Sequence, residues 1–524
     1  MSISTPRIFF GWHSISMRRL CFHNETLSGT TFLGKRHISI IYIFFILLFI
    51  LFTLRSLGSG SRISDTLGSD REGGTSTGPG TDSGLGSSSL SPLGLPGDYQ
   101  HVDEQPPLCA QRLGLAYLED LRHNRATYCS EQSKSQLTCF HSQTDKSGRT
   151  DSFCIRRGAR LNEPRTIFQT SCHLVEPWGV ETNESSLPLK RFPKYWYDTG
   201  PRTIFDSFVN LTVEDLQLSS HNESEKFTIL LKREGARNPW HCIMEIMALG
   251  MTLDVLQFSP DSTRRGDRRA FLTPNDAPNT QVVILDDEVD GPYFDLWRLF
   301  AKKPTVRLSE LPAGAEIGNI IIPLPGASNP VWQGDWGPNS CDHSELLQTF
   351  SRRVLSHFNI SGSRKLSANM EDNKIIVTFI DRRGTRKLID LDKHIAALNN
   401  RYAHAELRLV DLAAIPLAEQ IQTVRDTDVL VGVHGAGLTH GMWLKEHSVM
   451  VEILPETFMH KGFRKLAGAM GHGYFSTHGI QPPGEDWTWQ TGDVVLEEDR
   501  FSKLMDVAIE SIYNKGPYNF DVYK

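Results

Sequence analysis

Apolar runs and helical patterns alternate along the second half of the chain. Residues 374–380, KIIVTFI, form a continuous apolar strand candidate, and shorter strand candidates follow at 406–410, 429–433 and 449–454. Helical patterns occupy 392–402, 417–425 and 437–444. Apolar strands that are separated by helices predict a parallel sheet that is covered on both faces.

A less regular version of the same alternation comes earlier in the chain. Strands are predicted over 227–231, 281–285, 305–308 and 319–324, and helices over 239–256 and 293–301. We therefore expect an α/β fold of two doubly wound, Rossmann-type domains that face a cleft, the N-terminal one over 100–340 and the C-terminal one over 341–495. Residues 496–524 are expected to form a tail and a last helix that packs back across the body.

The beginning of the chain has a different pattern. Residues 38–54 carry no charged side chain and are about as long as the shortest helix that spans a bilayer. Basic residues outnumber acidic ones in the segment 1–37, so we expect this tail in the cytosol and the rest of the chain in the lumen. Residues 55–99, rich in Gly and Ser, predict a flexible stem. A cleaved signal peptide is the alternative interpretation of the apolar run.

Cysteines and glycosylation sequons agree with a lumenal location. Five cysteines lie within 109–172, and Cys242 and Cys341 follow, which predicts disulfides with at least one cysteine unpaired. The cysteine-rich region, 100–225, has few periodic runs and predicts irregular structure. N-glycosylation sequons stand at Asn183, Asn210, Asn222 and Asn359. The cytosolic tail and the apolar run together predict a single-pass type II membrane protein. Because the chain ends in DVYK and not in a KDEL-type signal, we expect it in the Golgi, with the endoplasmic reticulum as the alternative.

The net charge excludes one class of function. The formal charge is −6 and the isoelectric point is about 6.3, so no basic surplus is available to bind a phosphate backbone. Nucleic acid is therefore not an expected partner.

A glycine-rich turn, VGVHGAGLT, follows the strand candidate 429–433. His434 ends the strand, and Gly435 and Gly437 leave room for a ligand to approach the backbone where the next helix begins. Such a turn either binds an anion through free N–H groups or serves only close packing. The turn alone does not decide between these two interpretations.

A basic turn, DRRGTRKLID, follows the strand candidate 374–380. In a parallel sheet this turn leaves the same carboxyl edge as the glycine-rich turn, so Arg382 and Arg386 are expected near Gly435. The planar guanidinium groups of two arginines suit phosphate oxygens. The alternative is a solvated basic turn.

Three motifs together resemble glycosyltransferase family 61. They are DRRGTRKLI, DVLVGVHGAGLTHGMW and VMVEILP, within a resemblance that extends over 227–479. It implies a GT-B-like fold, a UDP-sugar donor held mainly by the C-terminal domain, and inversion at the anomeric carbon. His440, where the xylosyltransferases of the family usually carry Asn, favours N-acetylglucosamine as the sugar, with xylose as the alternative.

The resemblance also assigns donor-binding residues. Arg382 and Arg386 would hold the diphosphate, and Glu452 would accept hydrogen bonds from the ribose. The glycine-rich turn would lie beside them through His434, Gly435, Ala436, Gly437 and Thr439. A structural acid at the strand end is the alternative role of Glu452.

Inverting transfer needs a base near the acceptor hydroxyl, and the segment NPWHCIMEIMALGM offers candidates. At 100° per residue, Trp240, Met244, Met247 and Met251 form an apolar stripe, whereas Asn238, His241 and Glu245 fall together away from it. We expect His241 or Glu245 to be the catalytic base and Asn238 to lie on the acceptor side. An ordinary solvated helix face is the alternative.

Two acidic clusters remain. Asp287, within LDDEVD, is an acceptor-side candidate, although acids at strand ends often only form turns. Residues 426–428, DTD, precede their strand and lie at the wrong end of the sheet for a metal at the donor site, so we expect no metal ligand there. The arginines can neutralise a diphosphate without a cation, and the dependence on a divalent metal stays open.

The sequence therefore predicts a membrane-anchored lumenal glycosyltransferase that moves a sugar from a UDP-sugar to a protein or glycan hydroxyl. The alternative is a non-catalytic lumenal protein that retains a pocket for nucleotide sugars or glycans.

Overall fold

The computed structural model describes the chain from residue 94 to residue 521. The gaps within this span are 103, 134–135, 143–148, 176–186, 215, 217–225, 262–268, 334–340, 361, 363–373, 484–486 and 514–518. The chain divides into two compact units, Met1–Ser87 and Ser88–Lys524, and every described residue belongs to the second. The predicted membrane segment 38–54, most of the stem, and the sequons at Asn183 and Asn222 lie outside the described residues.

The later strands form a six-stranded sheet in which every neighbouring pair is parallel, as predicted. The strands, in spatial order, are β11 (Ala405–Val410), β10 (Ile375–Ile380), β12 (Val429–Val433), β13 (Val449–Leu454), β14 (Gly473–His478) and β15 (Asn519–Asp521). The chain leaves β10 for β11 on one side and then crosses to β12 on the other. The carboxyl ends of β10 and β12 therefore form a topological switch point, where open parallel sheets bind ligands.

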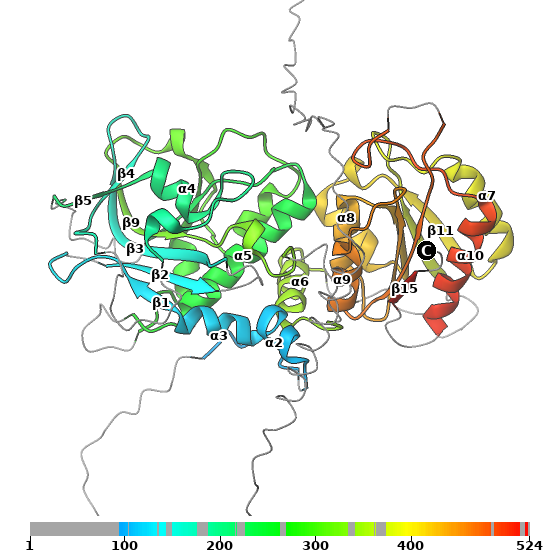
Figure 1. Cartoon of the computed structure of the whole chain (residues 1–524), viewed down its shortest axis with the longest axis horizontal. Coiled ribbons are helices and arrows are strands. Elements are labelled where there is room, and N and C mark those ends of the chain that lie inside the picture. The colour runs from blue at the N-terminus through cyan, green and yellow to red at the C-terminus, as the bar shows by residue number, and fades with distance from the viewer. Residues whose placement is uncertain are drawn as a thin grey trace, which may run out of the picture. The chain divides into compact units, whose positions relative to one another are not determined.

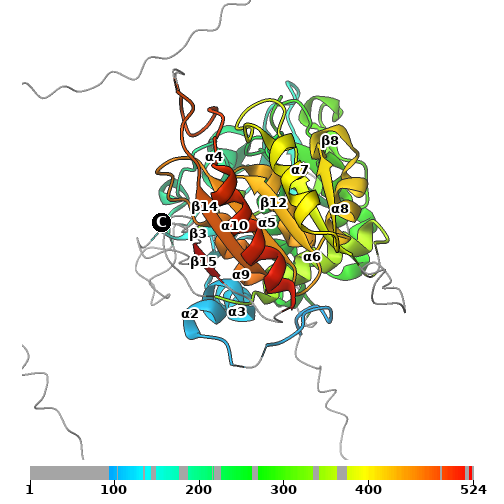
Figure 2. The same cartoon turned by 90° about the vertical axis from the view of Figure 1, so that its right-hand side faces the viewer.

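Helices cover both faces of this second sheet because its central strands, β10, β12 and β13, are apolar and buried on both sides. Val431, Val451 and Phe475 pack with α7 (Leu391–Arg401) and α10 (Glu498–Glu510). Alternate residues such as Leu430 and Met450 pack with α8 (Leu417–Arg425) and α9 (Gly462–Ala469) on the opposite face. Figure 2 shows α7 and α10 side by side in front of the strands. The last helix thus packs on the second sheet.

The earlier strands form a nine-stranded mixed sheet with the main order β1-β2-β3-β9-β6-β7-β8. Its parallel part comprises β6 (Phe227–Leu231), β7 (Thr280–Ile284), β8 (Val306–Arg307) and β9 (Glu316–Ile322). The chain runs from β6 through β7 and β8 and returns to β9 on the other side of β6. This sheet therefore has a second switch point, between the carboxyl ends of β6 and β9.

The prediction that 100–225 is irregular is wrong. This region supplies α2 (Pro107–Leu113), α3 (Leu115–His123), β1 (Arg125–Thr127), β2 (Leu137–Ser142), β3 (Asp151–Leu161), β4 (Phe168–Ser171), α4 (Gly200–Ser207) and β5 (Val209–Thr212). Strands β1 to β3 continue the first sheet in antiparallel fashion, because β3 pairs with β9. The coarse expectation of an α/β fold with parallel sheets is confirmed, but the first sheet is mixed.

Helix α5 (Pro239–Phe258) connects β6 to β7 within the first sheet and packs between the two sheets (Figure 1). It contacts the short 3-10 segment Gly326–Ser328 after β9 and the 3-10 segment Ala436–Trp443 after β12. Among the described residues it is the one helix long and apolar enough to cross a membrane, but 89% of that window is buried, as in a core helix. Helix α6 (Glu345–His357) joins the same core.

Two segments that were predicted as α-helices form 3-10 helices, which have fewer residues per turn. They are the segments Phe294–Leu299 and Ala436–Trp443. In the second of them, Gly441 lies so close to Met450 that a Cβ atom would stand 2.4 Å from its sulfur, and this packing needs the small residues of the motif.

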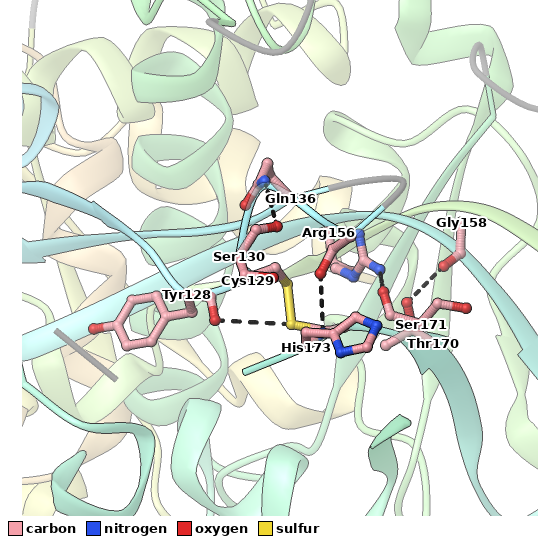
Figure 3. Close-up of a disulfide and its surroundings, with 11 residues drawn as sticks. Tyr128, Cys129, Ser130, Gln136, Arg156, Gly158, Thr170, Ser171 and His173 are labelled. Carbon is pink, nitrogen blue, oxygen red and sulfur yellow. Dashed lines mark hydrogen bonds between the residues drawn. A yellow bond between two sulfur atoms is a disulfide. The ribbon is translucent and has the colours of Figure 1, made fainter. Parts of the chain in front are cut away.

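Three disulfides tie the first part of the chain together, and Cys242 is free and buried, which confirms the expectation of an unpaired cysteine. Cys139–Cys154 joins β2 to β3, and Cys129–Cys172 joins the end of β1 to the end of β4. Figure 3 shows the second of these beside Arg156, whose guanidinium donates to the Ser171 carbonyl. Asn210 and Asn359 are exposed.

Removing the Cys109–Cys341 disulfide is expected to destabilise the fold more than removing Cys139–Cys154. The first bond links residues 232 apart and fastens α2 to the segment before α6, whereas the second links residues 15 apart. Cross-linking a longer loop removes more entropy from the unfolded chain, and the loss of a native disulfide costs about 2–5 kcal/mol. Urea unfolding of the two double-serine variants measures the difference. Equal midpoints would contradict this order.

Candidate active site

A cleft of about 620 Å³ lies where the two switch points meet. Asn238 and His241 reach it from the loop and helix after β6, and Ala327 from the segment after β9. Arg386 and the glycine-rich turn reach it from the ends of β10 and β12. The two sheets thus present their ligand-binding edges to one cavity.

Arg382 and Arg386 lie together against Gly435. A Cβ atom on Gly435 would stand 2.2 Å from Nη1 of Arg382 and 3.2 Å from Nη2 of Arg386. This close approach is possible only with glycine. The sequence prediction that the basic turn and the glycine-rich turn share one sheet edge is therefore met in space, because β10 and β12 are parallel neighbours.

The two guanidiniums carry charge that nothing neutralises within the part of the chain that the structure describes. Arg382 donates through Nε to the Thr385 carbonyl at 3.0 Å, and the buried Nε of Arg386 has no partner. Burial, together with the charge of Arg382, lowers the pKa of Arg386 to about 10, and burial lowers the pKa of Arg382. Two like charges held together in this way favour an anion between them.

Arg386 also has an unusual backbone. Its φ of 55° lies in the left-handed region, which non-glycine residues seldom occupy, and its N–H donates to the Thr491 carbonyl at 3.3 Å. Backbone strain of this kind often marks a ligand-binding position. A larger cavity, of about 740 Å³, lies on the α7 side of the same strand ends; Arg382 lines this cavity, whereas Arg386 lines the cleft.

His434 and Glu452 form a buried pair behind the glycine-rich turn. His434 Nδ1 lies 2.5 Å from Glu452 Oε1, and the other oxygen of Glu452 accepts from the Tyr474 hydroxyl. Because the carboxylate accepts at Nδ1, the Nε2 atom of His434 is left for the cleft, which this residue lines. Burial lowers the pKa of His434.

The other predicted donor residues divide into two groups. Ala436 lines the cleft. Gly437 packs under Ile380, Thr439 is fully buried, and Glu452 is 1% exposed inside β13, so none of these three lines the cleft. His440 is also buried, at 1% exposure, and lies 2.7 Å from Gln420 through Nε2.

His241 stands at the N-terminus of α5 with a defined orientation. Its Nδ1 lies 2.9 Å from the Glu234 carbonyl, which can only accept, so the proton of the neutral ring sits on Nδ1 and the lone pair on Nε2. The rings of Tyr197 and Trp332 flank it at centroid distances of 5.0 and 4.6 Å. Burial lowers the pKa of His241, which keeps the ring neutral at pH 7.

Glu245 does not share the cleft with His241. It is 2% exposed and packs against Gly326, because α5 is buried almost all round and not along one apolar stripe as the sequence pattern predicted. Its Oε1 accepts from the Glu234 N–H at 3.0 Å, and burial raises its pKa well above the usual value. The side chain thus holds the loop whose carbonyl orients His241.

The acceptor-side candidates lie apart from each other. Asn238 lines the cleft and caps α5 by accepting from the Trp240 N–H at 3.0 Å. Asp287 is exposed and lines a separate hollow beside Arg165 and Arg307.

The acids that were set aside as metal ligands have structural partners. Asp428 accepts from the Ile376 N–H at 2.8 Å at the amino edge of the second sheet. Among the described residues, no group of three or more His, Cys, Asp or Glu side chains is gathered as a metal site requires.

Aromatic residues that the sequence analysis did not assign to the site line much of the cleft. They are Tyr195, Trp196, Tyr197, Trp240, Trp332, Phe458, Phe463 and Trp489. The charged residues among the described lining are Arg149, Lys194 and Arg386, and no aspartate or glutamate is among them. The aromatic segment RFPKYWYDTG was the available signal, but its residues have no period that points to a cleft.

Two facing switch points, a glycine turn and two arginines without a counter-charge among the described residues are an arrangement that favours an anionic ligand. Residues 240–451 match the model of the family Glycosyltransferase 61, which confirms the resemblance drawn from the three motifs.

Two individual proteins with similar sequences are also glycosyltransferases. The chain is 27% identical over 312 residues to the EGF domain-specific O-linked N-acetylglucosamine transferase of Drosophila melanogaster, which covers 56% of this chain and 51% of the relative. It is 30% identical over 237 residues to the protein of that name from Mus musculus, with 44% and 41% covered. The chain thus spans about half the length, or less, of these relatives. The findings support the expectation of a glycosyltransferase.

Proposed function

We propose that this protein is an inverting glycosyltransferase of the GT-B type that uses a UDP-sugar. The observation that carries the proposal is the pair of guanidiniums of Arg382 and Arg386, held against Gly435 without a counter-charge among the described residues. A diphosphate supplies the missing negative charge and several acceptor oxygens. N–H groups of the turn that begins at Gly435 add to this anion site.

His241 is the catalytic base in this proposal. The acceptor hydroxyl oxygen attacks C1 of the sugar, and its proton passes to Nε2 of His241. The bond between C1 and the phosphate oxygen breaks, and its electron pair leaves with UDP, whose added charge the two arginines stabilise. No carboxylate among the described lining residues competes for this role.

N-acetylglucosamine is the proposed sugar, and a hydroxyl of an EGF-like domain is the proposed acceptor. Both come from the names of the similar proteins. The three disulfides suit an oxidising compartment, which supports a place in the secretory pathway, with residues 38–54 as a type II membrane anchor.

The test of this function is an assay of the full-length protein. Purified protein is incubated with UDP-N-acetylglucosamine or UDP-xylose and a folded EGF-like domain, and UDP release and the mass of the domain are followed. Addition of one N-acetylglucosamine to the domain is expected. Binding of the nucleotide sugar without transfer to any acceptor, or to water, would contradict the enzymatic proposal.

Replacing Gly435 by alanine is expected to weaken UDP binding by about tenfold or more, because the new methyl group displaces the Arg382 guanidinium and breaks charge-assisted hydrogen bonds. Gly384 in the basic turn has nothing within 4 Å of its added Cβ, so Gly384→Ala is the matched control. Calorimetric titration with UDP measures both. Equal losses in the two variants would argue against the close approach at Gly435.

A further inference from the structure

A second hollow, of about 380 Å³, shares His241, Tyr197 and Asn238 with the cleft but contains neither arginine of the anion site. Its remaining lining residues are Gly235, Arg237, Glu288 and Val289. We call it the Val289 groove. His241 therefore borders two spaces, one that also contains Arg386 and one that does not.

The Val289 groove offers apolar surface, an exposed arginine and one carboxylate, Glu288, which already accepts from a backbone N–H. Val289 is 61% exposed and Tyr197 is 40% exposed, so both present apolar surface to the groove that they line. Arg237 is exposed and forms no ion pair among the described residues. Such a surface suits a polypeptide that carries an apolar side chain and an acidic group.

The walls of the groove are held rigidly. Arg233, buried beneath the loop after β6, donates to Asp286 at 2.8 Å and to Asp290 at 2.7 Å, and so ties this loop to the one after β7. The Ala236 N–H donates to Glu288 at 2.9 Å across the same two loops. A surface that is ordered before binding loses less entropy when a partner docks.

The ring of His241 is fixed between the two spaces. Gly235, with a φ of 75°, turns the loop so closely that a Cβ atom would stand 3.2 Å from Nδ1 of His241. Nδ1 is occupied by the Glu234 carbonyl, so Nε2 is the nitrogen left for a ligand. His241 lines both spaces, so an acceptor in the groove and a sugar in the cleft would adjoin the same ring.

We propose that the Val289 groove binds the acceptor polypeptide. A residue next to the acceptor serine or threonine places an apolar side chain against Val289 and Tyr197, and an acidic side chain pairs with Arg237. The acceptor oxygen then attacks the sugar from the side opposite to the diphosphate, as inversion requires. This inference rests on the proposed transferase function and adds how the acceptor is selected.

The experiment compares Val289→Asp with Val213→Asp in the full-length protein. Val213 is a valine of similar exposure, 67%, beyond the end of β5, and lines neither space. Each variant is assayed with UDP-N-acetylglucosamine and an EGF-like domain, and its affinity for UDP is measured by calorimetry. We expect Val289→Asp to raise the KM for the domain by about tenfold or more with little change in UDP affinity, and Val213→Asp to change neither, because only the first carboxylate is desolvated by the acceptor.

A second variant distinguishes a loss of acceptor recognition from a local distortion of the groove. Arg237→Glu is expected to raise the KM for the same domain. The rise in KM is expected to be smaller with a domain in which the acidic residues near the acceptor hydroxyl are replaced by lysine. An unchanged KM in both groove variants, with transfer by the parent protein intact, would overturn the inference alone. A parent protein that binds UDP but transfers to neither water nor the domain would overturn the proposed function, and this inference with it.

Discussion

Replacing Arg386 by alanine is expected to weaken UDP binding by about tenfold to over a hundredfold, and to lower transfer by at least as much. Losing a hydrogen bond to a charged group costs about 1.5–3 kcal/mol, and the guanidinium at this position faces Gly435 beside Arg382. The leaving diphosphate gains charge during the reaction, so the loss in kcat/KM exceeds the loss in affinity. Calorimetry with UDP and initial rates with the full-length protein measure the two effects.

The same turn supplies the control for this prediction. Arg383 is exposed and is paired with Asp381 at 2.8 Å, so Arg383→Ala removes an equal charge from the same turn at a residue that does not line the cleft. Arg386→Lys keeps the charge and loses the planar fork, and is expected to recover part of the affinity. If Arg383→Ala weakened UDP binding as much as Arg386→Ala, a general effect of net charge would explain the result, and the proposed direct contact of Arg386 with the diphosphate would be wrong.

The second sheet was predictable because its central strands are apolar on both faces. A run such as 374–380 has no polar side to place in solvent, so only a sheet between two helical layers suits it, and the parallel order follows. That order alone brought Arg382, Arg386 and Gly435 to one edge. The first sheet was harder, because β1 to β3 join it through long-range antiparallel pairing with β9, which leaves no local period to recognise.

The helix α5 shows why the base was only partly predictable. Periodicity separated His241 and Glu245 from an apolar stripe, but it does not reveal what packs on the other side of a helix. The segment after β9 covers Glu245, which becomes a buried acid that braces a loop, while His241 at the first turn stays at the cavity. The aromatic lining was missed for the same reason, since Trp196 and Trp332 come from irregular segments far apart in sequence.

Replacing His241 by alanine is expected to lower kcat for transfer by about a hundredfold to ten-thousandfold, the usual contribution of a general base, with UDP affinity nearly unchanged. The neutral ring is the active form, and burial lowers its pKa below the ordinary value of 6.5. The rate of the parent protein should therefore rise with pH through that lowered pKa and be flat around neutral pH. Rates between pH 4 and pH 8 would show this acidic limb in the parent protein and its absence in the variant.

The distinction between a base and a packing residue rests on that pH profile. His241 fills space between the rings of Tyr197 and Trp332, so a loss of rate alone is compatible with a disturbed pocket. His241→Gln keeps a polar side chain of similar length without a titrating group, and the exposed His173 supplies a histidine-to-glutamine control elsewhere. If the acidic limb of the pH profile survives in His241→Gln, the titration belongs to another group. His434 is then the next histidine to replace, because its Nε2 is also left for the cleft.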